Sequence, residues 1–135
     1  MVIAGQFSGG KMLADSSLVF VYGSLKRGFP LHQHLAGAKF IANAKTKSIY
    51  FLVDCGKYPG LRHATNQQAG VSVVGQIFEV DMKTLGLLDE VEGVSEGLYR
   101  REAIQLRGSH EHNHVWAWLY LSDEFDQRII GDTWV

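Results

Sequence analysis

The chain lacks the features that mark several specialised classes of protein. It has one cysteine, Cys55, among 135 residues, so no disulfide can form within it, which fits a reducing, cytoplasmic compartment. Its formal net charge is only -1, which gives no reason to expect a nucleic acid or an acidic membrane as partner. No apolar run approaches the roughly 18 residues that a membrane-spanning helix needs. We therefore expect a soluble protein, and 135 residues are enough to bury a core without disulfides.

The first residues are expected to stand apart from the fold. Residues 1–17 are mostly polar and glycine-rich, which predicts a flexible leader, and residues 18–135 are expected to form a single domain. The run from Gly5 to Lys11 spells G-x-x-x-x-G-K, as in a phosphate-binding loop. Met12 follows it, where a Ser or Thr hydroxyl would hold magnesium, so nucleotide hydrolysis is disfavoured.

The patterns along the chain predict a mixed α+β domain with mostly antiparallel strands and two short helices. Strands are expected over residues 18–22, 39–44, 48–53, 70–80, 99–107 and 114–121, with a turn at 58–61. A short helix is expected over 30–35. A longer helix is expected over 82–92, with Asp81 as its N-cap and Gly93 as its stop.

One carboxylate interrupts the apolar face of the longer helix. Met82, Leu85 and Leu88 recur at a spacing of three and mark the face expected to turn toward the sheet, and Glu92 is the next position on that face. Loss of water would raise the pKa of a carboxyl group there, toward the range in which it accepts and returns a proton near neutral pH. In the alternative interpretation, Glu92 lies in a frayed last turn and points to solvent.

The first predicted strand stops abruptly at a glycine. Residues 18–22 are continuously apolar, and Gly23 then begins a loop at the carboxyl end of the strand. Backbone N–H groups are released from sheet pairing at such an end, and α/β proteins commonly bind ligands there. The loop is therefore a candidate binding element.

Five stretches of the sequence form a pattern through their order and spacing: VFVYGSLKRG (19–28), YPGL (58–61), GQIFEV (75–80), LDEVEG (88–93) and YRR (99–101). Together they resemble the γ-glutamylcyclotransferase-like family, and most of all its γ-glutamylamine cyclotransferase branch. The resemblance implies a compact mixed fold with a partly barrel-like sheet flanked by helices. It also implies release of 5-oxoproline from a small γ-glutamyl substrate, when the α-amine attacks its own γ-carbonyl, with no metal or organic cofactor.

The resemblance implies a catalytic residue. Leu88 to Glu92 matches the family's L-D-x-apolar-E pattern, which places the role of general acid and base on Glu92. A carboxylate with a raised pKa suits this role, because it can take a proton from the attacking amine and give one to the departing amine. Asp89 and Glu90 are expected to face solvent or to cap neighbouring loops.

The resemblance also implies substrate-binding residues. Tyr22, Gly23, Ser24 and Leu25 match the family's Y-G-S/T-L loop, which holds the γ-glutamyl group largely through backbone groups. Tyr99 matches a tyrosine that lines the pocket or bonds the substrate, although as an aromatic residue it equally suits the start of a half-buried strand. The amine half of the substrate and the oligomeric state are not predicted.

Other reactive side chains have competing interpretations. His110, His112 and His114 alternate, so on a strand they would share one side and could bind a transition metal, whereas outside a strand they would lie in solvent. Ser24 lacks the G-x-S-x-G elbow of a nucleophile, so a hydrogen-bonding hydroxyl is preferred. Cys55 is expected to be a small buried side chain.

Two functions of different class therefore remain open. One is a cofactor-independent γ-glutamyl cyclotransferase that uses Glu92. The other is a non-catalytic module of the same fold that binds a γ-glutamyl or similar amino-acid-like metabolite. Replacing Glu92 separates them, because only the enzyme has turnover to lose.

Overall fold

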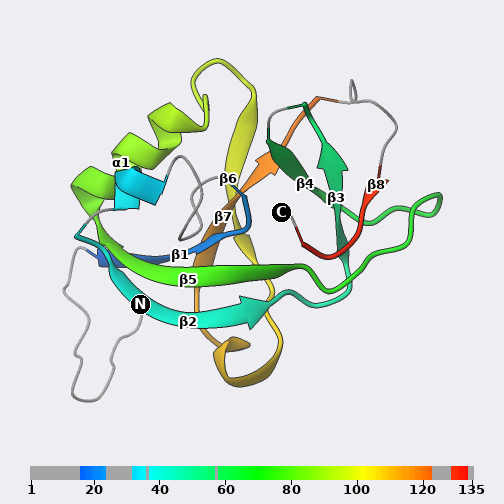
Figure 1. Cartoon of the computed structure of the whole chain (residues 1–135), viewed down its shortest axis with the longest axis horizontal. Coiled ribbons are helices and arrows are strands. Elements are labelled where there is room, and N and C mark those ends of the chain that lie inside the picture. Colours follow the sequence, from blue (N-terminus) through cyan, green and yellow to red (C-terminus); the bar gives the residue numbers. More distant parts are fainter. Residues whose placement is uncertain (1–15, 24–31, 36, 57, 123–128, 134–135) are drawn as a thin grey trace.

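The computed structural model describes residues 16–23, 32–35, 37–56, 58–122 and 129–133. Most of the predicted leader, residues 1–15, lies outside this part, as do Ser24 and Leu25 of the predicted loop. The described chain forms an eight-stranded sheet with one α-helix against it (Figure 1). No helix in this part is long and apolar enough to cross a membrane.

The elements follow one another in a mixed order. The strands are β1 (Ser16–Val21), β2 (Lys39–Lys45), β3 (Tyr50–Asp54), β4 (Pro59–His63), β5 (Val74–Asp81), β6 (Tyr99–Ile104), β7 (Val115–Tyr120) and β8 (Ile129–Ile130). The helices are the 3₁₀ turns η1 (His32–Leu35) and η2 (Gly108–His110) and the α-helix α1 (Met82–Val91). The predicted α+β class is therefore confirmed.

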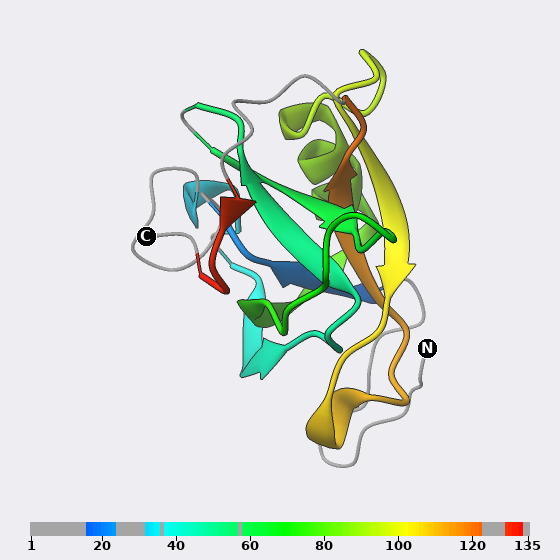
Figure 2. The same ribbon diagram turned by 90° about the vertical axis from the view of Figure 1, so that its right-hand side faces the viewer.

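The sheet branches at β7. Its strand order is β2-β5-β1-β7-β4-β3-β8, and β6 also pairs with β7. Both β1 and β4 run parallel to β7, with Val19 opposite Trp116 and Leu61 opposite Leu119, while the other strand pairs are antiparallel. Since β6 occupies one edge of β7, β1 and β4 share the other edge. The two halves of the sheet, β2-β5-β1 and β4-β3-β8, diverge from β7 (Figures 1 and 2). Both halves contribute side chains to one core.

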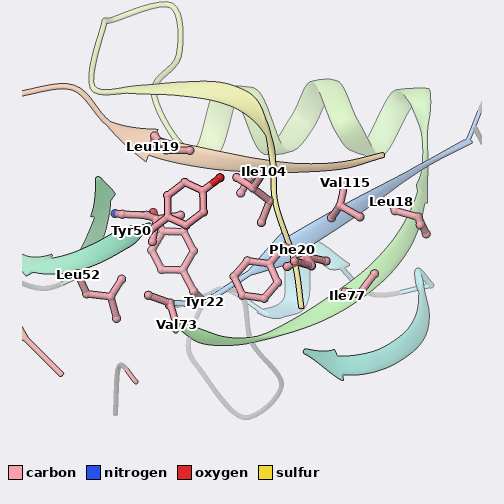
Figure 3. Close-up of a cluster of buried hydrophobic side chains, with 13 residues drawn as sticks. Leu18, Phe20, Tyr22, Tyr50, Leu52, Val73, Ile77, Ile104, Val115 and Leu119 are labelled. Carbon is pink, nitrogen blue, oxygen red and sulfur yellow. The ribbon is translucent and has the colours of Figure 1, made fainter. Parts of the chain in front are cut away.

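Strand β1 is buried on both faces, which explains its unbroken apolar run. Leu18, Phe20 and Tyr22 belong to the core enclosed by the sheet, where they meet side chains from β5, β6 and β7 (Figure 3). Val19 and Val21 belong to a second core, which lies under α1. The end of β1 therefore lies between two packed layers.

Helix α1 begins and packs largely as predicted. The Oδ1 atom of Asp81 accepts a hydrogen bond from the Thr84 N–H at 2.7 Å, which is a normal N-cap. Leu85 and Leu88 are buried, but Met82 is 65% exposed, so the predicted apolar stripe is wrong at its first position. The reason is geometric: each step of three residues turns about 60° short of a full turn, so Met82 lies about 120° around the axis from Leu88.

The predicted turn at 58–61 is also wrong, because Pro59, Gly60 and Leu61 belong to β4. Proline is tolerated as the first residue of a strand, and Pro59 has that position. Gly60 serves a close approach to β7, since a Cβ atom added there would lie 2.6 Å from Cβ of Tyr120 and 3.0 Å from Sγ of Cys55. The strand predicted at 70–80 starts only at Val74.

We expect opposite effects from alanine at two glycines. Gly60→Ala should lower the free energy of unfolding by about 1–3 kcal/mol, because the new methyl group collides with Tyr120. Gly86→Ala should raise it by about 0.5–1 kcal/mol, because Gly86 lies within α1 and its added Cβ would meet no atom within 4 Å. Urea unfolding of both variants measures this. An unchanged midpoint for Gly60→Ala would contradict the close packing of β4 on β7.

Candidate active site

The end of α1 fixes the backbone of Glu92. Glu92 is the C-cap residue, and Gly93 follows it with a left-handed φ of 69°. Three hydrogen bonds close the helix: Glu92 N–H to Leu88 O at 2.9 Å, Gly93 N–H to Glu90 O at 3.0 Å, and Val94 N–H to Asp89 O at 3.0 Å. The last two form a Schellman motif. A frayed last turn, the alternative interpretation, is therefore not observed.

The Glu92 side chain lies half-buried at this helix end. Among the described residues its carboxylate accepts no hydrogen bond and forms no ion pair. Burial raises the pKa of the carboxyl group from 4.5 to about 7, because none of the described residues compensates the charged form for the lost water. The group therefore titrates near neutral pH.

Two tyrosines from distant parts of the sequence lie near this carboxylate. Tyr22 follows the end of β1, and Tyr99 is the first residue of β6. Burial is the main cause that raises the pKa of both hydroxyls above 10, and the charge of Glu92 contributes to both increases. Both side chains therefore remain neutral phenols, and the fold brings these three predicted site residues together.

The hydrogen bonds of the two phenols differ. The Tyr22 hydroxyl donates to the Trp118 carbonyl at 2.6 Å and accepts from the Leu61 N–H at 3.1 Å, so it is engaged by two strands of the sheet. The Tyr99 hydroxyl donates to the Pro59 carbonyl at 2.7 Å. With its proton committed, Tyr99 can act toward a ligand only as an acceptor. Tyr99 is 4% exposed, and it is the buried first residue of β6, a strand that is otherwise exposed or half-buried up to Ile104.

Gly23 lies where the chain leaves β1 and passes close to β4. A Cβ atom at Gly23 would lie 2.8 Å from Cγ of Pro59, so a larger residue would push the two segments apart. Gly23 is buried, directly after Tyr22. The backbone of Gly23 is therefore held beside β4, where the Pro59 carbonyl accepts the hydrogen bond of the Tyr99 hydroxyl.

The sequence did not single out two further tyrosines beside Tyr99. The Tyr99 ring lies 5.4 Å from the Tyr120 ring and 6.2 Å from the Tyr58 ring, between centroids. Cys55 is half-buried next to them, and burial raises the pKa of its thiol, so it too is neutral at pH 7. Only the YPGL match could have indicated Tyr58, and the position of Tyr120 depends on its pairing with Tyr99 in β6.

Asp89 is not where the sequence placed it. It is half-buried and accepts hydrogen bonds from the side chains of Arg101 and Trp118, so the prediction that it faces solvent or caps a loop is wrong. Glu90 is exposed, as predicted.

The histidine alternation does not form a strand. His110 belongs to η2 and its Nδ1 lies 3.1 Å from Oδ1 of Asn113, whereas the His114 ring packs 4.6 Å from the Trp116 ring. In the described part of the chain, no group of three or more His, Cys, Asp or Glu side chains could hold a metal ion. The arrangement that a strand-borne metal site would need is therefore not formed.

Comparison with known proteins identifies the family. The model of the family described as "Gamma-glutamyl cyclotransferase, AIG2-like" matches residues 19–135, so the chain belongs to this family. A Vibrio cholerae protein provisionally named a γ-glutamylcyclotransferase is 37% identical over 107 residues, which are 79% of this chain and 83% of that protein. The γ-glutamylaminecyclotransferase of Rattus norvegicus is 38% identical over 96 residues, which are 66% of this chain and 62% of that enzyme.

A solved structure supports the fold. The crystal structure of an AIG2-like protein from Mus musculus superposes with a TM-score of 0.63 at 28% identity, covering 83% of this chain and 80% of that one. Relatives named for γ-glutamyl and for γ-glutamylamine substrates match at similar identity. The comparisons thus define the family and not the branch.

The raised pKa of Glu92 predicts a pH-dependent stability. The folded-state pKa of about 7 exceeds the ordinary 4.5, so the native state binds the proton more tightly and stability falls as pH rises from about 4.5 to 7. At about 1.4 kcal/mol per pKa unit, the full loss is about 3 kcal/mol. Glu92→Gln should avoid this loss and gain about that much on the wild type between pH 4 and pH 8.

Urea unfolding at several pH values measures the difference. Glu90→Gln is the matched control, because its side chain is exposed on the same turn of α1, and its stability should follow the wild-type pH profile. Parallel profiles for Glu92→Gln and the wild type would show that Glu92 is not desolvated.

Proposed function

We propose that this protein is a γ-glutamyl cyclotransferase in which Glu92 is the general acid and base. Its substrate would be a γ-glutamyl amine or γ-glutamyl amino acid, and its products 5-oxoproline and the free amine. The observation that carries the proposal is a half-buried carboxylate with a pKa of about 7 and no cation or donor among the described residues. Family membership and the names of the relatives support the same chemistry.

The proposed reaction needs one group that both takes and gives a proton. The substrate α-ammonium loses a proton to Glu92, and the resulting amine attacks the γ-carbonyl carbon. The new C–N bond closes the five-membered ring, and Glu92, having passed the first proton to solvent, takes a second proton from the attacking nitrogen. The bond from the γ-carbon to the departing nitrogen then breaks while Glu92 gives this second proton to that nitrogen, so the ring nitrogen of 5-oxoproline keeps one hydrogen. With a pKa of about 7, Glu92 is suited to both transfers near neutral pH.

The reaction is intramolecular, so the protein has mainly to hold the γ-glutamyl chain folded. Negative charge grows on the γ-carbonyl oxygen as the ring closes, and backbone N–H groups of the loop from Gly23 through Ser24 to Leu25 are the proposed donors. Ser24 and Leu25 lie outside the described residues. The Tyr22 hydroxyl is not proposed as a donor, because its proton is committed to Trp118.

Tyr99 is proposed to help bind the α-ammonium. Its hydroxyl donates to Pro59, which leaves oxygen lone pairs to accept an N–H from the substrate. Glu92 contributes to the raised pKa of Tyr99, which indicates that the two groups lie close together. The pair would therefore offer two acceptors to one ammonium group.

The direct test is release of 5-oxoproline, measured by mass spectrometry, from γ-glutamyl amines, γ-glutamyl amino acids and glutathione. We expect release by the wild type and by Glu90→Gln, and a loss of at least about 100-fold in Glu92→Gln. Equal activity in Glu92→Gln would remove Glu92 as the catalyst. Binding of these compounds without release by the folded wild type would favour the non-catalytic binding module.

Tyr99→Phe should lower kcat/KM about 10-fold, because a hydrogen bond to a charged group contributes about 1.5–3 kcal/mol. Tyr50→Phe is the matched control: Tyr50 is also buried, and its hydroxyl also bonds the backbone, accepting from the Gln105 N–H at 3.0 Å. Both variants should lose stability, but only Tyr99→Phe should lose activity. The same loss of kcat/KM in both would reduce the role of Tyr99 to folding.

A further inference from the structure

We propose that Asp89 is a positioning residue that sets where the Glu92 carboxylate lies, an inference that rests on the function proposed above. Asp89 lies in the last turn of α1, three residues before Glu92. Its Oδ1 atom accepts hydrogen bonds from Trp118 Nε1 at 2.8 Å and from Arg101 Nε at 3.0 Å. One carboxylate oxygen therefore ties the end of the helix to two strands.

The two donors are themselves held in place. Arg101 in β6 and Trp118 in β7 lie directly opposite each other, so their side chains share the face that α1 covers. Trp118 is 2% exposed, and a buried indole N–H requires an acceptor. The Arg101 guanidinium lies 4.6 Å from the centre of the Trp116 ring, which restricts its position further. Asp89 thus binds a rigid part of the sheet.

The spacing of helix and strands transfers this constraint to Glu92. The next cross-strand pair on the same face is Tyr99 and Tyr120, about 6.6 Å further along the strands. Glu92 is three residues beyond Asp89, about 4.5 Å along the helix, on a neighbouring position of its surface. With Asp89 at the level of Arg101, Glu92 comes to the level of Tyr99. The contribution of Glu92 to the electrostatics of Tyr99 agrees with this placement.

Apolar contacts alone would fix this geometry less well. Leu85 and Leu88 hold α1 on the core, but burial of apolar surface is not directional and permits a small rotation of the last turn. The hydrogen bonds of Asp89 are directional, and one of them is also an ion pair. A rotation outward would return Glu92 to water.

Asp89 also fixes the position of the Arg101 guanidinium. Its pairing with Asp89 keeps the guanidinium over Trp116, instead of free to approach the Glu92 carboxylate and stabilise its charged form. In the described part of the chain, the side chains with a raised pKa around Glu92 are neutral and come from the end of β1, the β3–β4 connection, β6 and β7. They are Tyr22, Cys55, Tyr99 and Tyr120, and burial raises the pKa of each.

The test compares Asp89→Ala with Asp89→Asn, which keeps the accepting Oδ1 atom. In Asp89→Ala we expect kcat for 5-oxoproline release to fall about 10- to 100-fold, with KM changed by less than about threefold, because Glu92 is misplaced by about an ångström. Carbon-13 NMR titration of the Glu92 side chain should show its pKa lowered by about one unit or more. Asp89→Asn should recover most of both properties, and Glu90→Ala, on the exposed side of the same turn, should change neither.

The outcomes separate this inference from the proposed function. A folded Asp89→Ala with wild-type kcat and wild-type Glu92 pKa would overturn the positioning role, even if its stability were lower. If Asp89→Ala does not fold, the comparison is repeated in the Gly86→Ala background. If the wild type releases no 5-oxoproline, the proposed function fails, and the NMR titration still decides whether Asp89 controls the environment of Glu92.

Discussion

The two strands that share one edge of β7 set the main constraint on this fold. Strand β1 pairs with the start of β7 and β4 with its end, so peptide groups between them would lack partners where β1 departs. The Tyr22 hydroxyl supplies both partners, since it donates to the Trp118 carbonyl and accepts from the Leu61 N–H. A buried unsatisfied peptide group costs about 1–3 kcal/mol, so one phenol stabilises the whole branch.

The branching of the sheet at β7 also decides which backbone groups near the end of β1 are paired. A strand within a continuous ladder has its N–H groups engaged, whereas β1 ends at Val21 and leaves Tyr22 and Gly23 outside the ladder. Gly23 lets this backbone run against Pro59, and the Pro59 carbonyl in turn holds Tyr99. The same departure of β1 thus places Gly23 beside Pro59, whose carbonyl accepts the hydrogen bond of Tyr99.

Signals within a short stretch of sequence were sufficient to predict α1, but not to predict the strands around it. The cap at Asp81 and the stop at Gly93 follow from residues within one helix, and both are observed. The expected burial of Leu85 and Leu88 is also observed, and Glu92 is half-buried at the end of the same helix. Gly60 is part of a strand because it pairs with Val53 of β3, and the close approach that excludes a larger residue comes from Tyr120, sixty positions later. The sequence shows neither contact, so the Pro-Gly pair predicted a turn instead. Family resemblance, not periodicity, indicated Tyr99, because its neighbours depend on sheet register.

Asp89 and Glu92 show how environment, and not residue type, determines what a carboxylate does. They lie within one turn of the same helix, and both are half-buried. Asp89 meets two donors from the sheet, which compensate its charge and make it an anchor. Glu92 meets none among the described residues, so its charge is uncompensated and its pKa rises to about 7. An uncompensated carboxylate would turn toward water if it were free to do so. The anchor one turn earlier, together with the Schellman motif, gives a physical reason why it stays.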